Sequence, residues 1–206
     1  MSSPSLGKGF EEAFREHGAK TALTFYRQGR PETEISYQDL DRDANRMTHV
    51  LRAWGVEKGD RLILFCPKSI LFVTAHLALQ KLGALAVPLN PGFKRSEMAY
   101  FLADARPRLV ICGPEQAGMI QDIDPEQAVL QVDPDTPYQD LDLFRSAPGQ
   151  AEAAELAPDD PGLVIYTSGT TGKPKGAVLT QRNLVHDAEN IIRIWEISEK
   201  DVLCHA

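Results

Sequence analysis

Short apolar runs alternate along the chain with segments whose apolar residues recur at helical spacing. Six apolar runs predict strands: Ala22 to Tyr26, Arg61 to Phe65, Ala84 to Leu89, Arg108 to Cys112, Ala128 to Val132 and Leu163 to Tyr166. Several of these runs are apolar throughout, which is typical of strands that are buried on both faces of a parallel sheet. The pattern therefore predicts an α/β fold with a mainly parallel sheet flanked by helices.

Segments with helical periodicity lie between these runs. In the first, apolar residues recur at spacings of four and three, with Ser36 as the predicted N-cap and Gly55 as the predicted end: Leu40, Ala44, Met47, Leu51 and Trp54. A second helix is predicted over residues 96–105. A last helix follows the final apolar run and has one apolar face: Leu184, Ala188, Ile191 and Trp195.

The stretch from Ser69 to Leu89 is the one long apolar candidate for a membrane span. A span needs about 20 consecutive apolar residues, but polar or helix-ending residues interrupt this stretch: His76, Gln80, Lys81 and Gly83. We therefore predict a buried helix that ends near Gly83, followed by a buried strand, and no transmembrane segment. The first residues of the chain also lack the apolar stretch of a signal peptide.

Aromatic and histidine side chains on the predicted helices could suggest cofactor or phosphate contacts. Four aromatic residues fall on apolar helix faces and are predicted to belong to the core: Trp54, Phe72, Tyr100 and Phe101. His186 has Asn183, Asp187 and Glu189 nearby in the sequence, so it is predicted to face solvent rather than a phosphate.

The net charge and the cysteine content limit which partners, metal sites and cellular compartments the sequence supports. The net charge of -7 argues against a broad surface for nucleic acid, although a local basic site for a small anion remains compatible with it. The 3 cysteines are widely spaced and contain no Cys-x-x-Cys pair, so a disulfide framework and a structural zinc site are not supported. A reducing, cytoplasmic compartment fits this pattern.

A stretch from Ser146 to Gly162 is rich in alanine, proline, glycine and acidic residues and has no apolar face. It predicts a boundary between an N-terminal α/β subdomain, residues 1–160, and the start of a following subdomain, residues 161–206. Its acidic residues could be metal ligands, but scattered acids in a linker are usually solvated, and that interpretation is favoured: Glu152, Glu155, Asp159 and Asp160.

The sequence YTSGTTGKPKG, residues 166–176, follows the last predicted strand and is rich in hydrogen-bond donors. Its glycines allow close approach of backbone amides, its hydroxyl groups can donate to phosphate oxygens, and its lysines add positive charge: Thr167, Ser168, Gly169, Thr170, Thr171, Gly172, Lys173, Lys175 and Gly176. Because Thr180 and Asn183 are predicted to start a helix, we expect the loop to occupy a strand-to-helix turn and to bind a phosphate group.

The loop does not match two common phosphate-binding fingerprints. A Walker loop would need glycine where Thr167 stands and serine or threonine where Pro174 stands. The dinucleotide fingerprint G-x-G-x-x-G differs from the G-x-x-G-x-x-x-G spacing found here. A P-loop phosphotransferase is therefore disfavoured.

The loop resembles the phosphate-binding signature of the adenylate-forming superfamily, which includes acyl-CoA synthetases, luciferases and the adenylation domains of peptide synthetases. Residues 35–62 resemble an early helix and strand unit of that superfamily, and residues 79–111 resemble its second motif region. Trp195 followed by DVLCHA is similar to the branch of acyl-CoA and malonyl-CoA synthetases.

This resemblance implies an AMP-forming ligase that joins a carboxylate to ATP and passes the acyl group to coenzyme A, as in fatty acid metabolism. The cofactor-binding residues implied are 167–173 and Lys175, with both lysines stabilising the charge that develops on the leaving pyrophosphate. Thr170 would also contact a magnesium ion.

In the superfamily, the ribose-binding aspartate, the adenine and magnesium motifs and the lysine of the mobile C-terminal domain would follow Ala206. The resemblance thus implies that this stretch holds no catalytic residue, is inactive alone and works with the C-terminal remainder of a larger polypeptide. A self-contained, non-catalytic nucleotide-binding or phosphate-binding module is the alternative. We also expect residues 168–175 to be the most mobile stretch after residue 162 when no nucleotide is bound.

Overall fold

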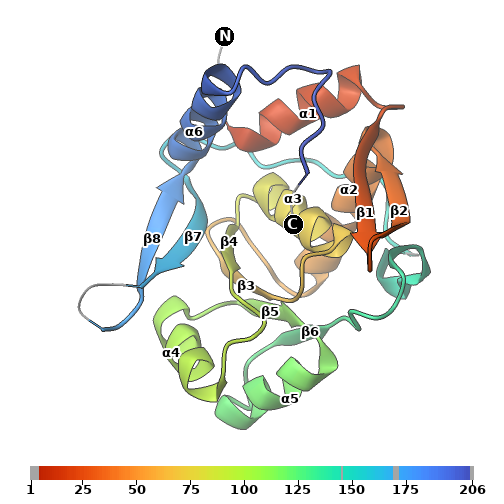
Figure 1. Cartoon of the computed structure of the whole chain (residues 1–206). Coiled ribbons are helices and arrows are strands. Elements are labelled where there is room, and N and C mark those ends of the chain that lie inside the picture. The colour runs from red at the N-terminus through yellow and green to blue at the C-terminus, as the bar shows by residue number, and fades with distance from the viewer. Residues whose placement is uncertain (1–4, 145, 169–171, 205–206) are drawn as a thin grey trace.

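A computed structural model gives the fold of the chain and describes residues 5–144, 146–168 and 172–204. Its centre is a sheet with the strand order β6-β5-β3-β4-β7-β8, shown in Figure 1. The strands are parallel except for the last pair, β7 and β8, and have these bounds: β3 Arg61–Phe65, β4 Leu85–Pro88, β5 Leu109–Cys112, β6 Val129–Gln131, β7 Pro161–Thr167 and β8 Lys175–Thr180. The predicted α/β fold with a mainly parallel sheet is confirmed.

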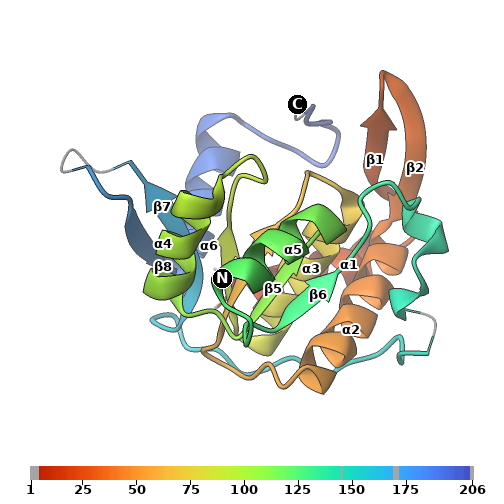
Figure 2. The same cartoon turned by 90° about the horizontal axis from the view of Figure 1, so that it is seen from below.

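Helices cover both faces of this sheet, as the two views in Figures 1 and 2 show. Alternate side chains of β3 enter two different cores: Leu62 and Leu64 pack with α2 (Tyr37–Ala53) and α3 (Ile70–Leu82), whereas Ile63 and Phe65 pack with α4 (Arg95–Ala105) and α5 (Pro114–Ile123). Successive strand residues point to opposite faces. A strand buried on both faces must therefore be apolar at every position, which is why this run was recognisable in the sequence.

A smaller unit precedes the sheet. It consists of α1 (Leu6–Glu16) and the antiparallel hairpin of β1 (Thr21–Arg27) and β2 (Arg30–Ser36). Figure 1 shows this hairpin beside the main sheet rather than within it. A third apolar cluster joins the unit to α2 and α3: Phe14, Ile35, Leu40, Ala44, Ile70 and Leu77.

Capping residues fix the ends of the two helices that cover the first face. The Ser36 hydroxyl accepts a hydrogen bond of 3.1 Å from the Asp39 amide at the start of α2, and the Ser69 hydroxyl accepts one of 3.1 Å from the Phe72 amide at the start of α3. Gly83 ends α3 in the left-handed conformation, with φ of 70°. The predicted N-cap Ser36 and the predicted helix end near Gly83 are confirmed. No helix among the residues described is long and apolar enough to cross a bilayer.

One aromatic residue departs from its predicted place. Phe101 is buried with 1% exposure, but Trp54 is 41% exposed. The prediction that Trp54 belongs to the core is wrong because α2 ends at Ala53 and Trp54 is its C-cap, so the indole no longer follows the apolar stripe of the helix.

The segment that follows the 3-10 turns Tyr138–Asp140 and Asp142–Phe144 contacts α2 and contains no helix or strand among its described residues up to β7. Three α2 side chains at spacings of four and three contact backbone oxygens of this segment: Asn45 with Gly149 (3.1 Å), His49 with Gln150 (2.8 Å) and Arg52 with Glu152 (2.9 Å). We call residues 149–155 the strap. The strap leads to β7, which joins the same sheet beside β4, and the division into subdomains 1–160 and 161–206 stays a prediction.

Candidate phosphate-binding site

The donor-rich loop connects the two antiparallel strands at the edge of the sheet. Thr167 pairs with Lys175 and Tyr166 pairs with Gly176, so the loop closes the β7–β8 hairpin. The prediction of a strand-to-helix turn is wrong, because β8 intervenes and α6 (Gln181–Ile194) begins only after it. Figure 1 shows the hairpin projecting from the sheet, with α6 at the opposite end of β8. The predicted helix start is nevertheless confirmed, since the Thr180 hydroxyl accepts from the Asn183 amide at 3.3 Å.

The described residues of the loop present their donors to solvent. Thr167, Ser168, Lys173 and Lys175 are exposed, and Gly172 has a φ of 94° that side-chain-bearing residues rarely adopt. The structure therefore places two ammonium groups and two hydroxyl groups on the same exposed hairpin end. Gly169, Thr170 and Thr171 lie outside the described residues, and the expectation about the mobility of residues 168–175 stays a prediction.

Aromatic side chains from α4 and β7 pack beneath the C-terminal arm of the loop. The Tyr100 hydroxyl donates to the Pro174 carbonyl oxygen at 2.7 Å, and the Lys173 ammonium lies 6.0 Å from the centre of the Tyr100 ring. The rings of Phe101 and Tyr166 are 4.8 Å apart in an edge-to-face arrangement. This polar contact was not predicted, because the helical period places the Tyr100 ring toward the core but carries no information about its hydroxyl.

Tyr166 makes its own contact with α4. Its hydroxyl donates to the Asp104 carboxylate at 2.6 Å. Burial, and secondarily the Asp104 carboxylate, raises the pKa of the Tyr166 phenol above its ordinary value. The phenol therefore stays protonated at neutral pH and keeps donating this hydrogen bond.

Other sequence candidates do not join the loop. His186 is exposed on α6, as predicted. Glu152, Glu155 and Asp159 are exposed as well, and the described part of the chain contains no group of three or more histidine, cysteine or acidic residues that could hold a metal ion. The Asp160 carboxylate instead forms an ion pair with Lys58 at 2.7 Å.

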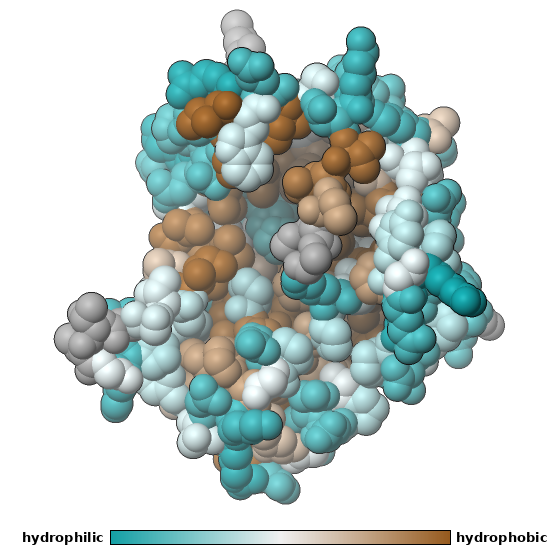
Figure 3. Space-filling view, viewed as in Figure 1, coloured by the Kyte–Doolittle hydropathy of each residue, from teal (hydrophilic) through white to brown (hydrophobic). Residues whose placement is uncertain are grey.

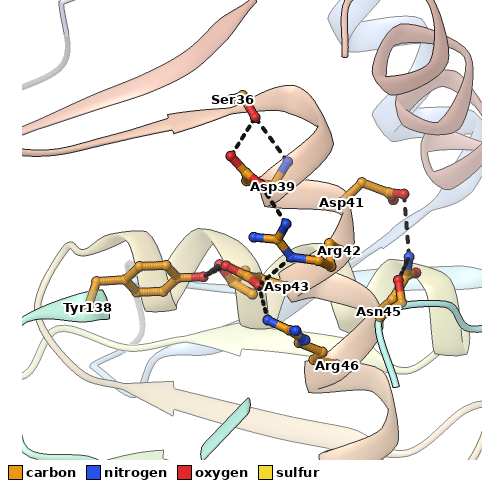
Figure 4. Close-up of polar contacts among 10 residues, drawn as sticks. Ser36, Asp39, Asp41, Arg42, Asp43, Asn45, Arg46 and Tyr138 are labelled. Carbon is orange, nitrogen blue, oxygen red and sulfur yellow. Dashed lines mark hydrogen bonds and ion pairs between the residues drawn. The ribbon is translucent and has the colours of Figure 1, made fainter. Parts of the chain in front are cut away.

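A second polar cluster lies on α2, far from the hairpin in sequence, and is drawn in Figure 4. The Tyr138 hydroxyl donates to the buried Asp43 carboxylate at 3.0 Å, and Arg46 pairs with the same carboxylate at 3.2 Å. An open cavity of about 310 Å³ lies beside this cluster. Arg42 lies 2.8 Å from Asp39 and 3.7 Å from Asp43, so the positive groups are already neutralised. We interpret the cluster as a structural link between α2 and the 3-10 segment.

Apolar side chains also remain exposed around α6, on the face shown in Figure 3. The large apolar residues of β8, α6 and the segment after it that are at least 37% exposed are Val178, Ile191, Ile192, Ile194, Trp195, Ile197, Val202 and Leu203. The predicted apolar face of α6 is thus only partly covered by the described residues.

Known proteins resemble this chain in sequence and in fold. The family model described as AMP-binding enzyme matches residues 10–206. The long-chain-fatty-acid–CoA ligase FadD13 of Mycobacterium tuberculosis (strain ATCC 25618 / H37Rv) is 35% identical over 173 residues, which cover 81% of this chain and 33% of the relative. Surfactin synthase subunit 3 of Bacillus subtilis (strain 168) is 30% identical over 175 residues, covering 85% of this chain and 13% of the relative.

A solved structure matches the whole chain. The crystal structure of ATP-bound MatB from Rhodopseudomonas palustris has a TM-score of 0.86 and 29% sequence identity, and the match covers 100% of this chain and 40% of that one. The chain spans about a third of the length of the curated CoA ligases that it matches. The family match, which takes in almost every described element from α1 to α6, means that the chain belongs to the AMP-binding enzyme family.

Proposed function

We propose that this chain is the phosphate-binding N-terminal portion of an ATP-dependent acid–thiol ligase. The ligase activates a carboxylate as an acyl-adenylate and transfers the acyl group to coenzyme A. The observation that carries the proposal is the YTSGTTGKPKG loop at the end of the β7–β8 hairpin, where the described threonine, serine and lysine residues are exposed. The similarity to FadD13 and to ATP-bound MatB supports an acyl-CoA ligase acting on ATP.

The chemistry requires donors that face the β- and γ-phosphates of ATP. As a carboxylate attacks the α-phosphorus, negative charge accumulates on the departing pyrophosphate. Lys173 and Lys175 supply fixed positive charge to those oxygens, and the hydroxyl groups of Thr167 and Ser168 supply hydrogen bonds. These groups contact the leaving group and not the thiol acceptor, so they act in the first half-reaction.

A magnesium ion fits this donor set. Magnesium is commonly bound through substrate phosphate oxygens, water and one or two protein carboxylates, and a threonine hydroxyl beside the phosphates adds a further hard oxygen ligand. We propose Thr170 as the hydroxyl that contacts it. When bound, the ion would neutralise charge on the β- and γ-phosphates.

The first prediction separates the two half-reactions. In the full-length protein that contains these residues, Lys175→Ala is expected to slow adenylation about 100-fold, as removal of one charge-stabilising donor does elsewhere. Thr170→Val is expected to act in the same direction. Transfer from preformed acyl-adenylate to coenzyme A should stay near the wild-type rate, because pyrophosphate has already left. Single-turnover kinetics measure both rates.

Lys8→Ala is the control for that measurement, because Lys8 is an exposed lysine on α1. It should leave both half-reactions unchanged. Equal losses in the two half-reactions of Lys175→Ala would contradict the assignment of this lysine to pyrophosphate.

A second prediction concerns the 206 residues alone. We expect them not to catalyse carboxylate-dependent exchange of labelled pyrophosphate into ATP, because the matching CoA ligases are about three times as long. Exchange above the background of a Lys175→Ala sample would favour a complete active site within this chain. Binding of ATP without exchange would be compatible with a phosphate-binding portion.

A further inference from the structure

The C-terminal arm of the phosphate-binding loop is tied to α4 by one side chain. Tyr100 donates its hydroxyl hydrogen to the carbonyl oxygen of Pro174 over 2.7 Å, across 74 positions of sequence. The Lys173 ammonium lies 6.0 Å from the centre of the same ring, at the outer limit of a cation–π contact. Tyr100 therefore contacts two successive loop residues: the charged side chain of Lys173 and the backbone of Pro174.

The two described loop residues before Pro174 offer few other anchors. Gly172 has open space around the position of a Cβ atom, and Lys173 is exposed. Pro174 is half-buried and has no amide hydrogen, so its carbonyl oxygen is the polar backbone atom through which this residue can be held. A bond to that oxygen restricts the backbone between Lys173 and Lys175, the two residues that carry the positive charges.

Tyr100 is itself held in place by its neighbours. Its ring lies 5.7 Å from the ring of Phe101 and 6.5 Å from that of Tyr166, both edge-to-face. Phe101 is 1% exposed, and the ring of Tyr166 lies 4.8 Å from that of Phe101. The ring of Tyr100 thus stands on a packed platform formed by α4 and the end of β7, and its hydroxyl has a fixed position from which to hold the loop.

We propose that Tyr100 is a positioning residue for the phosphate-binding loop, one that holds the Lys173–Lys175 arm through the Pro174 carbonyl and the Lys173 ammonium. The proposal rests on the proposed function in one respect: the ligand bound by this arm is taken to be the pyrophosphate portion of ATP. Tyr100 does not contact this ligand. It orders the backbone that carries the ammonium groups, so that less conformational entropy is lost when the phosphates bind.

Two matched variants separate this role from simple packing. Tyr100→Phe keeps the ring and removes the hydroxyl that reaches Pro174. Tyr166→Phe also keeps its ring, but removes a hydroxyl that reaches Asp104 and not the loop. Both variants belong to the same aromatic cluster, so a general loss of packing would affect both, whereas a positioning role affects Tyr100→Phe alone.

The first readout is tryptic cleavage of the Lys175–Gly176 bond, located by mass spectrometry. This bond lies where the arm joins β8, and the neighbouring Lys173–Pro174 bond resists trypsin because proline follows the lysine. A single hydrogen bond changes a local opening equilibrium by about 2- to 12-fold. We expect Tyr100→Phe to accelerate cleavage by this factor with an unchanged thermal midpoint, and Tyr166→Phe to be cleaved at the wild-type rate.

The second readout is the affinity for inorganic pyrophosphate, measured by calorimetry on the same three proteins. Tyr100→Phe should bind about 2- to 12-fold more weakly than wild type, and Tyr166→Phe should bind like wild type. Equal cleavage rates in Tyr100→Phe and wild type, or the same acceleration in both variants, would overturn the proposal. Failure of the wild-type chain to bind pyrophosphate would instead count against the proposed function, and the cleavage rates would still decide the role of Tyr100.

Discussion

Gly83 shows how one residue can decide both the end of a helix and the path of a distant segment. It adopts the left-handed conformation after α3, with φ of 70°. A Cβ atom there would lie 2.6 Å from Leu156 Cδ2 and 3.1 Å from Lys58 Cγ. Gly83 thus lets the chain turn from α3 into β4 and leaves room for Leu156, which follows the strap.

Gly83→Ala should therefore destabilise the protein by about 1–3 kcal/mol, because it combines an unfavourable backbone conformation with a close contact. Gly118→Ala is the matched control. Gly118 lies within α5 and has nothing within 4 Å of a Cβ position, so alanine there should stabilise the helix by about 0.5–1 kcal/mol. Urea unfolding of both variants measures the difference, and equal effects would contradict the argument.

At the scale of elements, the Asp160 carboxylate holds the turn that leads into β7. Asp160 accepts hydrogen bonds from the Ala157 amide at 2.8 Å and pairs with the Lys58 ammonium at 2.7 Å. The Lys58 contact, followed by the Ala157 hydrogen bond, lowers the pKa of Asp160 below its ordinary value. Asp160 therefore fastens the segment after the strap to the loop between α2 and β3, directly before the strand that carries the phosphate-binding loop.

Asp160→Asn should reduce stability at neutral pH by about 1 kcal/mol or less, since the ion pair is near the surface. A lowered pKa means that the charged form stabilises the folded state above the ordinary pKa of 3.8. This contribution is lost as the pH falls through the still lower pKa of the folded state. The difference in urea midpoint between wild type and variant should thus be constant above about pH 5 and shrink below pH 4. A difference that grows on acidification would contradict the assignment.

The strands recovered most accurately from the sequence are those that are buried on both faces, although β1 and α6 were also recovered with few buried residues. β3 matches its predicted bounds, Arg61 to Phe65, because both of its faces enter apolar cores. β2 and β8 were not predicted, because each borders solvent: in β2 only Ile35 is buried, and in β8 no residue is. α5 was missed as well, since only Ala117 and Ile120 are buried along its length.

The candidate site was also predictable only in part. The residues of the loop could be named from the sequence, because their types and spacing are local. The hairpin geometry could not, since a strand with exposed Val178 and Lys175 resembles a loop leading to a helix. The bond between Tyr100 and Pro174 joins residues 74 positions apart, and no single-sequence pattern encodes such a contact.

At the scale of the whole molecule, a chain of buried side-chain amide groups joins α1 to α6. Gln181, fully buried at the start of α6, accepts from the Leu6 amide at 3.1 Å and donates to Gln80 of α3 at 3.0 Å. Gln80 donates in turn to the Gly162 carbonyl oxygen of β7 at 3.1 Å. These three hydrogen bonds join α1, α3, β7 and α6 through two side chains that are 1% exposed or less.

The last prediction is that Gln80 and Gln181 are energetically coupled. Gln181→Leu leaves the Leu6 amide and the Gln80 side-chain oxygen without their partner, and each buried orphan costs about 1–3 kcal/mol. Gln80→Leu likewise deprives Gln181 and the Gly162 carbonyl of a partner. The double variant removes both side chains, so only the two backbone groups lose a partner, and its cost should be below the sum of the single costs by about 1 kcal/mol or more. Urea unfolding of the four proteins gives this coupling, with Gln121→Leu on the exposed side of α5 as the control for adding a leucine. Additive costs would mean that the two side chains stabilise the fold independently and that the network does not act as one unit.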